Sequence, residues 1–117
     1  MITKIGSQAP YFEFLDGIKG KNLYDLKQKY HIVIYKAEDD QLEQYEDEFE
    51  RANVKLIDYV QITTKDFAKH FGLDENRDLF ILIDQYGVVQ YVSDKVPSFE
   101  EIMNLISFAE DEGCCAL

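Results

Sequence analysis

The chain has 117 residues, 46% of them hydrophobic and 14% aromatic, so we expect one globular domain with its own core and exclude a disordered chain. Its 23 Asp and Glu residues outnumber its 12 Lys and Arg residues, and the formal net charge of -11 repels nucleic-acid phosphates and anionic lipid head groups. The two cysteines are adjacent, which excludes a disulfide-rich secreted class. No stretch has the pattern of a signal peptide or a spanning helix, so a cytoplasmic chain is expected.

The first third of the chain predicts a strand, a short helix and a second strand. Residues 11–15 alternate with a period of two, which is typical of a strand, and glycines follow them. Asn22 is a suitable N-cap for a short helix over residues 23–30. Residues 32–35 are an uninterrupted apolar run of the length of a buried strand, so we expect this strand at the centre of the sheet.

An acidic amphipathic helix is predicted over residues 40–53. Its apolar positions recur every three to four residues, whereas the opposite face is almost entirely carboxylate. Asp40 and Glu43 have the spacing of a capping box at the start of this helix. The acidic run lacks the glycine turn and the alternating oxygen ligands of a calcium loop, so a solvated helix face is the better interpretation.

Another strand and helix follow, and then a hairpin. Residues 54–62 predict the strand, and the helix after it begins at Thr63 or Thr64 and ends at Gly72. Between residues 79 and 92, two apolar runs joined by a short glycine-containing loop indicate an antiparallel hairpin.

The last predicted helix has a capping box formed by Ser98 and Glu101, and Gly113 is expected to end it. The order of elements predicts a single α/β domain whose mixed central sheet is flanked by helices on both faces. We expect this domain to span residues 1–113 and a Cys-Cys tail to span residues 114–117.

Four stretches carry a resemblance to a known family. IGSQAPYFEF has a glycine, then Ala-Pro, then alternating aromatics, and KNLYDLKQKYHIVIY joins a short helix to a core strand. KHFGL is a helix end before the hairpin, and LFILIDQYGVVQYV is that hairpin, with Asp84 and Gly87 in its turn. Together they resemble the thioredoxin fold in its peroxiredoxin-like version, the alkyl hydroperoxide reductase and thiol-specific antioxidant family. The resemblance implies a thioredoxin-like fold and a redox-associated role.

The chain departs from this family at its reactive site. In thioredoxin-like proteins the first turn of the helix after the core strand holds the reactive cysteine, but no cysteine, serine or threonine lies between Tyr35 and Phe49. Asp40 and Glu43 stand at roughly the place of a C-x-x-C motif. The cis-proline of the fold would lie near Asp78, where this chain has no proline. We therefore do not expect peroxidase activity of the usual kind.

The only thiols are Cys114 and Cys115, and we predict that they act as an exchangeable catalytic pair. Consecutive Cα atoms lie about 3.8 Å apart, closer than the roughly 4.4 Å minimum of an ordinary disulfide, so a bond between them would be strained and labile. Such a pair suits thiol-disulfide exchange or acceptance of a sulfur species or a soft metal. The acidic residues just before it disfavour the thiolate, and an inert chain end is the alternative.

Two other interpretations of the cysteines are disfavoured. A zinc site would need both His31 and His70, or a second chain, and these positions suit core and helix-end roles better. CCAL has the outline of a prenylation box, but its second position is not aliphatic and acidic residues precede it. No metal or cofactor is expected.

The rival hypothesis is a non-catalytic domain that binds a partner protein. Lys36, Asp39, Asp40 and Asp78 would line its groove, at the place where the fold keeps its site. A simpler role for Lys36 is an ion pair with the carboxylates at residues 38–40. The expected partner is a protein or a thiol substrate rather than nucleic acid or membrane, and a homodimer is left open.

Overall fold

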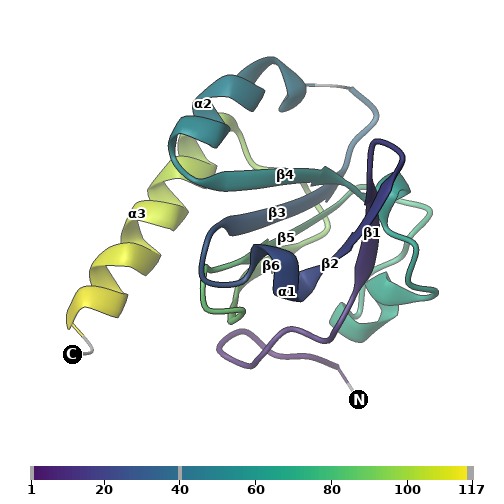
Figure 1. Cartoon of the computed structure of the whole chain (residues 1–117), viewed down its shortest axis with the longest axis horizontal. Helices are drawn as coiled ribbons and strands as arrows, with labels where there is room; N and C mark the ends of the chain where they lie inside the picture. Colours follow the sequence, from purple (N-terminus) through teal and green to yellow (C-terminus); the bar gives the residue numbers. More distant parts are fainter. Residues whose placement is uncertain (1, 40, 116–117) are drawn as a thin grey trace.

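The structure is a computed structural model that describes residues 2–39 and 41–115, with side chains described up to residue 108. A mixed sheet of four strands in the order β4-β3-β5-β6 forms its centre (Figure 1). β3 (His31–Lys36) pairs in parallel with β4 (Val54–Asp58) and antiparallel with β5 (Leu79–Ile83), which pairs antiparallel with β6 (Val89–Ser93). The predicted central strand and the predicted hairpin are both confirmed.

The side chains of β3 alternate between two hydrophobic clusters, one on each face of the sheet. Ile32 and Ile34 belong to the cluster covered by α1 (Leu23–Leu26), the 3-10 helix η3 (Phe67–Phe71) and an N-terminal hairpin over residues 13–22. Val33 and Tyr35 belong to the cluster covered by α2 (Glu46–Arg51) and α3 (Phe99–Cys115). The predicted mixed sheet with helices on both faces is therefore confirmed. Within the described residues, no helix is long and apolar enough to cross a membrane.

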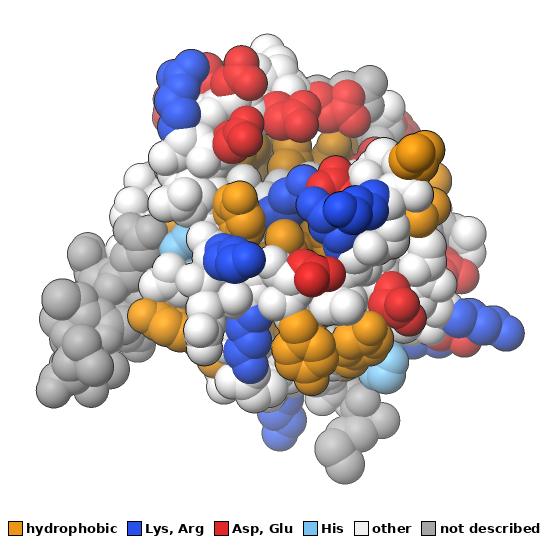
Figure 2. Space-filling view, viewed as in Figure 1, with side chains coloured by type: hydrophobic (Ala, Val, Ile, Leu, Met, Phe, Trp, Pro, Cys, Tyr) orange, Lys and Arg blue, Asp and Glu red, His pale blue; other side chains and the backbone are white. Residues whose placement is uncertain are grey.

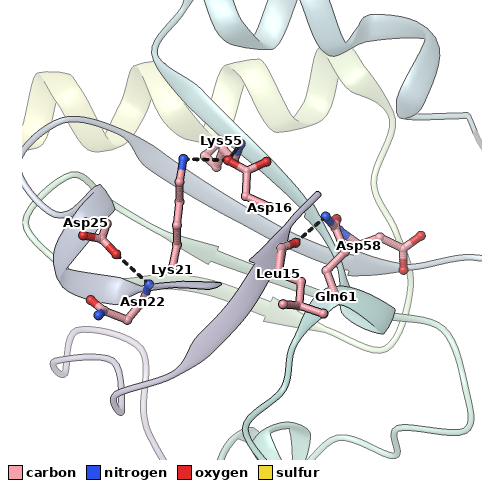
Figure 3. Close-up of polar contacts among 8 residues, drawn as sticks. All are labelled: Leu15, Asp16, Lys21, Asn22, Asp25, Lys55, Asp58 and Gln61. Atoms are coloured by element: carbon pink, nitrogen blue, oxygen red, sulfur yellow. Dashed lines mark hydrogen bonds and ion pairs between the residues drawn. The ribbon is translucent and has the colours of Figure 1, made fainter. Parts of the chain in front are cut away.

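The N-terminal strand forms a hairpin of its own. β1 (Glu13–Asp16) pairs antiparallel with β2 (Lys19–Asn22), and Gly17 in the turn has a φ of 68°, which favours glycine. The prediction contained the first strand of this sheet but not the second. Asn22 then caps α1 in a full capping box, since its backbone N–H donates to the Asp25 carboxylate at 2.9 Å (Figure 3). The predicted N-cap is confirmed.

The acidic helix begins later than the sequence predicts. A 3-10 turn, η1 (Glu43–Tyr45), comes first, and α2 follows it with Tyr45 as an N-cap that makes no side-chain capping bond. Asp40 lies outside the described residues. The carboxylate of Glu43 instead accepts a hydrogen bond from the Tyr35 hydroxyl at 3.2 Å, which draws the turn toward the sheet. A helix over the whole of residues 40–53 is therefore wrong.

The segment after β4 forms two 3-10 helices, where the sequence predicts the end of a strand and an α-helix. The strand ends at Asp58 and gives way to the 3-10 helix η2 (Tyr59–Gln61), which Asp58 caps. Thr64 does not cap the next helix, because its hydroxyl accepts a hydrogen bond from the Glu13 N–H at 2.7 Å. That helix is η3, a 3-10 helix, and Gly72 ends it in the left-handed conformation as predicted.

The last helix has the predicted start and a different end. The Ser98 hydroxyl accepts a hydrogen bond from the Glu101 N–H at 3.3 Å, which is the N-cap half of the predicted box. α3 then continues past Gly113 to Cys115, so the predicted stop at Gly113 is wrong. A glycine inside a helix costs about 1 kcal/mol relative to alanine, and this cost does not by itself end the helix.

Candidate functional site

A charged pocket lies at the carboxyl end of β3, between the loop that follows this strand and the loop that precedes β5. Its volume is about 390 Å³, and its lining consists of Lys36, Ala37, Glu38, Asn76, Arg77 and Asp78. A second hollow of about 310 Å³ shares Lys36 and Asn76 with it and extends to Asp58, Tyr59, Val60, Ile62 and Glu75. Because β3 is antiparallel to β5, the carboxyl end of β3 and the amino end of β5 lie next to each other at the same end of the sheet.

Lys36 joins the two loops. Its ammonium group donates a hydrogen bond to the backbone carbonyl of Glu75 at 2.5 Å. Within the described residues it forms no ion pair with Glu38 or Asp39, and Asp40, the third carboxylate of the predicted pairing, lies outside the described residues. The Lys36 side chain therefore lines both hollows and ties the end of β3 to the loop before β5, while Glu38 lines the first hollow.

The loop before β5 is shaped by Asp74. Its carboxylate accepts a hydrogen bond from the Asn76 N–H at 2.9 Å, and its carbonyl accepts one from the Arg77 N–H at 3.1 Å, which makes a tight turn. The Arg77 side chain lies 3.8 Å from the Asp74 carboxylate but is 82% exposed. The turn therefore presents the Arg77 guanidinium to solvent beside the pocket.

The structure brings together two of the four residues predicted for the binding groove. Lys36 and Asp78 line the same pocket, although 42 positions separate them in the sequence. Asp39 is exposed and does not line the pocket; its carboxylate accepts a hydrogen bond from the Gln41 amide at 2.9 Å. Asp40 lies outside the described residues.

Sequence reasoning missed Asn76 and Arg77 as site residues. The signal was present, since the run DENRD supplies turn-forming residues directly before a fully apolar strand. Such a run predicts a tight surface loop at the edge of the sheet. The contact between this loop and Lys36 depends on the antiparallel register of β3 and β5, which a local pattern does not give.

The described lining of the two hollows offers no strong nucleophile. It contains no cysteine, serine, threonine or histidine, and its one hydroxyl group belongs to Tyr59. Burial raises the pKa of Tyr59, and its oxygen accepts a hydrogen bond from the Ala68 N–H at 3.0 Å, so this group stays protonated and structural at neutral pH. No group of three potential metal ligands occurs among the described residues. The arrangement suits charged recognition rather than covalent chemistry.

The two predicted catalytic cysteines belong to another part of the molecule. The backbone of Cys114 and Cys115 forms the end of α3, and their side chains lie outside the described residues. Figure 1 shows α3 running toward the C-terminus on the side opposite the carboxyl ends of β3 and β4. The prediction that these thiols react therefore stays a prediction.

Comparisons with solved structures place this arrangement in a known fold, although no family model and no curated protein sequence matches the chain. Reduced 2-Cys peroxiredoxin of Plasmodium vivax is similar over 95% of this chain and 99% of its own, with a TM-score of 0.75 and 19% identity. Thioredoxin peroxidase I of Plasmodium yoelii gives a TM-score of 0.72 and 21% identity over 94% of this chain and 92% of its own. AhpC of Mycobacterium tuberculosis gives 0.65 and 11% over 96% of each chain.

Proposed function

We propose that this chain, which has the peroxiredoxin-like version of the thioredoxin fold, is a binding domain that engages a partner protein at the carboxyl end of β3. The observation that supports the proposal is the charged pocket at this end of β3. Lys36 and Arg77 stand there with Glu38 and Asp78, and the described part of the lining contains no thiol. A site of this kind recognises charge and does not form a covalent intermediate.

The composition of the pocket favours a protein partner over a small ligand. Its volume of about 390 Å³ is at the lower end for small-molecule sites, which are mostly lined by apolar and aromatic groups. Here Ala37 is the only apolar residue among the described residues of the lining. Cations and carboxylates on two loops instead form charge-assisted hydrogen bonds with complementary groups and fix the orientation of a docked surface.

Site-specific photo-crosslinking in cells tests this function. A photo-reactive phenylalanine analogue replaces Asn76, which is exposed and lines both hollows. The matched control carries it at Tyr86, which is 57% exposed in the β5–β6 turn at the opposite end of β5. We expect a discrete crosslinked protein from position 76 alone, and its loss when Arg77→Glu is added. Equal crosslinking from both positions, or no effect of Arg77→Glu, contradicts the proposal.

A second candidate function rests on the adjacency of Cys114 and Cys115 at the end of α3. In this function one thiolate attacks a disulfide of a substrate and forms a mixed disulfide, releasing one substrate thiolate. The neighbouring cysteine thiolate then attacks the mixed disulfide and releases the second substrate thiolate. The substrate disulfide is reduced and the cysteine pair is oxidised to a strained bond, which exchanges readily. A sulfur species or a soft metal is the other cargo that two thiolates would accept.

Single substitutions separate these uses of the cysteines. In thiol-disulfide exchange, the attacking cysteine needs its neighbour to release the bound substrate. Either Cys114→Ser or Cys115→Ser should therefore accumulate a mixed disulfide that the intact pair releases. The double serine variant is the control and should form no adduct in intact-mass analysis. A soft metal would instead bind more weakly to each single variant, without any adduct. If neither variant changes in either way, this second function is excluded.

A further inference from the structure

Exposed apolar side chains gather where the β1–β2 hairpin meets η2. Ile18 in the hairpin turn is 103% exposed, Val60 in η2 is 83% exposed and Leu15 in β1 is 44% exposed. The side-chain amide of Gln61 donates a hydrogen bond to the carbonyl of Leu15 at 2.9 Å, which holds η2 against β1 (Figure 3). Clustered apolar side chains of this kind, bordered by charged residues, mark protein interaction surfaces.

A basic cluster borders these apolar residues. The ammonium groups of Lys21 and Lys55 lie 2.7 Å and 3.2 Å from the same oxygen of Asp16 (Figure 3). Lys19 is the exposed strand partner of Asp16. These three cations and the one carboxylate together carry a net charge of about +2, against -11 for the whole chain. We call Lys19, Lys21 and Lys55 the basic cluster.

An acidic rim lies beside the basic cluster on the same face. It consists of the α2 carboxylates Glu46 and Glu50, which are one helical turn apart and have no ion-pair partner among the described residues. A hollow of about 120 Å³ separates rim and cluster, lined by Tyr30, Glu46, Glu50, Val54, Lys55 and Leu56. Figure 2 shows Lys and Arg side chains in the middle of this face, below a row of Asp and Glu side chains.

We propose that a second copy of this chain docks on this face, around a two-fold axis at the boundary between the acidic rim and the basic cluster. A two-fold rotation places the rim of each copy on the cluster of the other, so both charge contacts are attractive. The rotation also brings the exposed apolar residues of the two hairpins into the contact region. Val60 also lines the second hollow at the end of β3, but none of the charged residues of the rim or the cluster lines either hollow, so the proposal stands without the proposed function.

A second copy fits this face better than other partners. Polyanions such as nucleic acids or acidic membranes are repelled by the net charge of -11 and by the rim itself. A uniformly basic partner would be repelled by the basic cluster. Another copy of the chain presents a basic cluster to the acidic rim and an acidic rim to the basic cluster. At about 0.15 M salt the Debye length is roughly 8 Å, so the repulsion between distant charges of the two chains is screened while contact pairs persist.

Charge reversal with mixing tests the proposed dimer. One variant, Glu46→Lys/Glu50→Lys, reverses the charge of the acidic rim and leaves the basic cluster intact. Another, Lys19→Glu/Lys21→Glu, reverses two of the three cations of the cluster and makes it net acidic, although Lys55 remains. Each variant alone then meets like charge, and we expect its dimer to dissociate at least about tenfold more readily than that of the wild type in sedimentation velocity. A one-to-one mixture should restore dimers, because an acidic copy and a basic copy attract each other at both contacts.

Control variants separate surface effects from changes in net charge. Asp94→Lys changes the net charge as Glu50→Lys does, but it follows β6, at the edge of the sheet opposite β4, and should leave association unchanged. Ile18→Ser should weaken association without lowering thermal stability. Lys19→Glu alone replaces the double variant if that variant does not fold. A monomeric wild type at millimolar concentration, a mixture that stays monomeric, or equal effects of Asp94→Lys and Glu50→Lys would overturn the proposal.

Discussion

β3 and the loop that follows it are consecutive in the sequence, but the strand is buried in the core and the loop is exposed to solvent. Residues 31–35 are buried, and their side chains alternate between the two hydrophobic clusters, so packing restricts each position. In the loop that follows, Glu38, Asp39 and Gln41 are exposed and polar, so few packing contacts restrict them. The solved structures share the fold at 11 to 21% identity, which shows how far sequence changes while this core persists. The chemistry at the strand end is therefore free to differ from that of other chains with this fold.

Removing a buried side chain from the sheet should have the largest effect on stability. Phe80 in β5 is 0% exposed and packs edge-on against Tyr91, with ring centroids 5.9 Å apart. We expect Phe80→Ala to lower the free energy of unfolding by about 3–5 kcal/mol, measured by urea denaturation. Phe108→Ala is the control, because Phe108 is 68% exposed, and it should change the value by less than about 0.5 kcal/mol. Equal losses in the two variants would contradict the division between core and surface.

Loss of the α1 cap should have an intermediate effect. Asn22 accepts a hydrogen bond from the Tyr24 N–H at 2.9 Å, and its own N–H is satisfied by Asp25. Asn22→Ala leaves the Tyr24 donor without this partner, so we expect a loss of about 1 kcal/mol in the free energy of unfolding. Asn22→Ser is the matched variant and should restore most of the loss, because serine also caps helices. A serine variant as unstable as the alanine variant would show that capping is not the cause.

The ion pairs of Asp16 should make a smaller, pH-dependent contribution. Hydrogen bonds from Lys21, and then from Lys55, lower the pKa of Asp16 below its usual range. A lowered pKa in the folded state stabilises the fold above the ordinary value of about 3.9, and this stabilisation is lost as the pH falls through the lowered pKa. Asp16→Asn should therefore be less stable than wild type at pH 7, by less than about 1 kcal/mol for such partly exposed pairs. The difference should close in acid, and a difference that stays constant with pH would exclude this cause.

The smallest effect on stability is expected in the loop at the end of β3. Arg77→Ala removes an 82% exposed side chain, so we expect a change in the free energy of unfolding within about 0.5 kcal/mol. The same substitution should markedly reduce the crosslink from position 76. Measuring both thermal unfolding and crosslinking of this variant shows whether Arg77 contributes to binding without contributing to stability. A large loss of stability would mean that the loop belongs to the packed core.

Sequence patterns predicted the parts of the fold that depend on local burial and capping. The apolar runs at 32–35 and 79–92 and the Asn22 cap are features of neighbouring residues, and each was found where it was expected. β2 was missed because its sequence, KGKN, has no apolar side chain and is held by its pairing with β1. The predicted start at Asp40 and the Thr64 cap were wrong because tertiary contacts of Glu43 and Thr64 replaced local ones.

The candidate site was predictable only in outline. Lys36 follows the central strand, and the resemblance placed Asp78 opposite it, so both were proposed from the sequence. Asn76 and Arg77 enter the pocket through the turn around Asp74 and through the strand register, which relate residues far apart in the chain. The tail thiols stay a prediction, since their side chains lie outside the described residues.

Stopped-flow measurement of hydrogen peroxide consumption tests most directly whether this fold has kept its core and lost its usual thiol chemistry. The described pocket at the end of β3 holds no thiol, and the acidic residues before Cys114 disfavour the thiolate of the tail. The account predicts that the reduced wild-type protein consumes peroxide no faster than free cysteine at the same thiol concentration, with no remaining reaction in the Cys114→Ser/Cys115→Ser variant. Consumption by the wild type well above the rate of free cysteine would contradict it, because the tail thiols would then have to be activated as in a peroxidase.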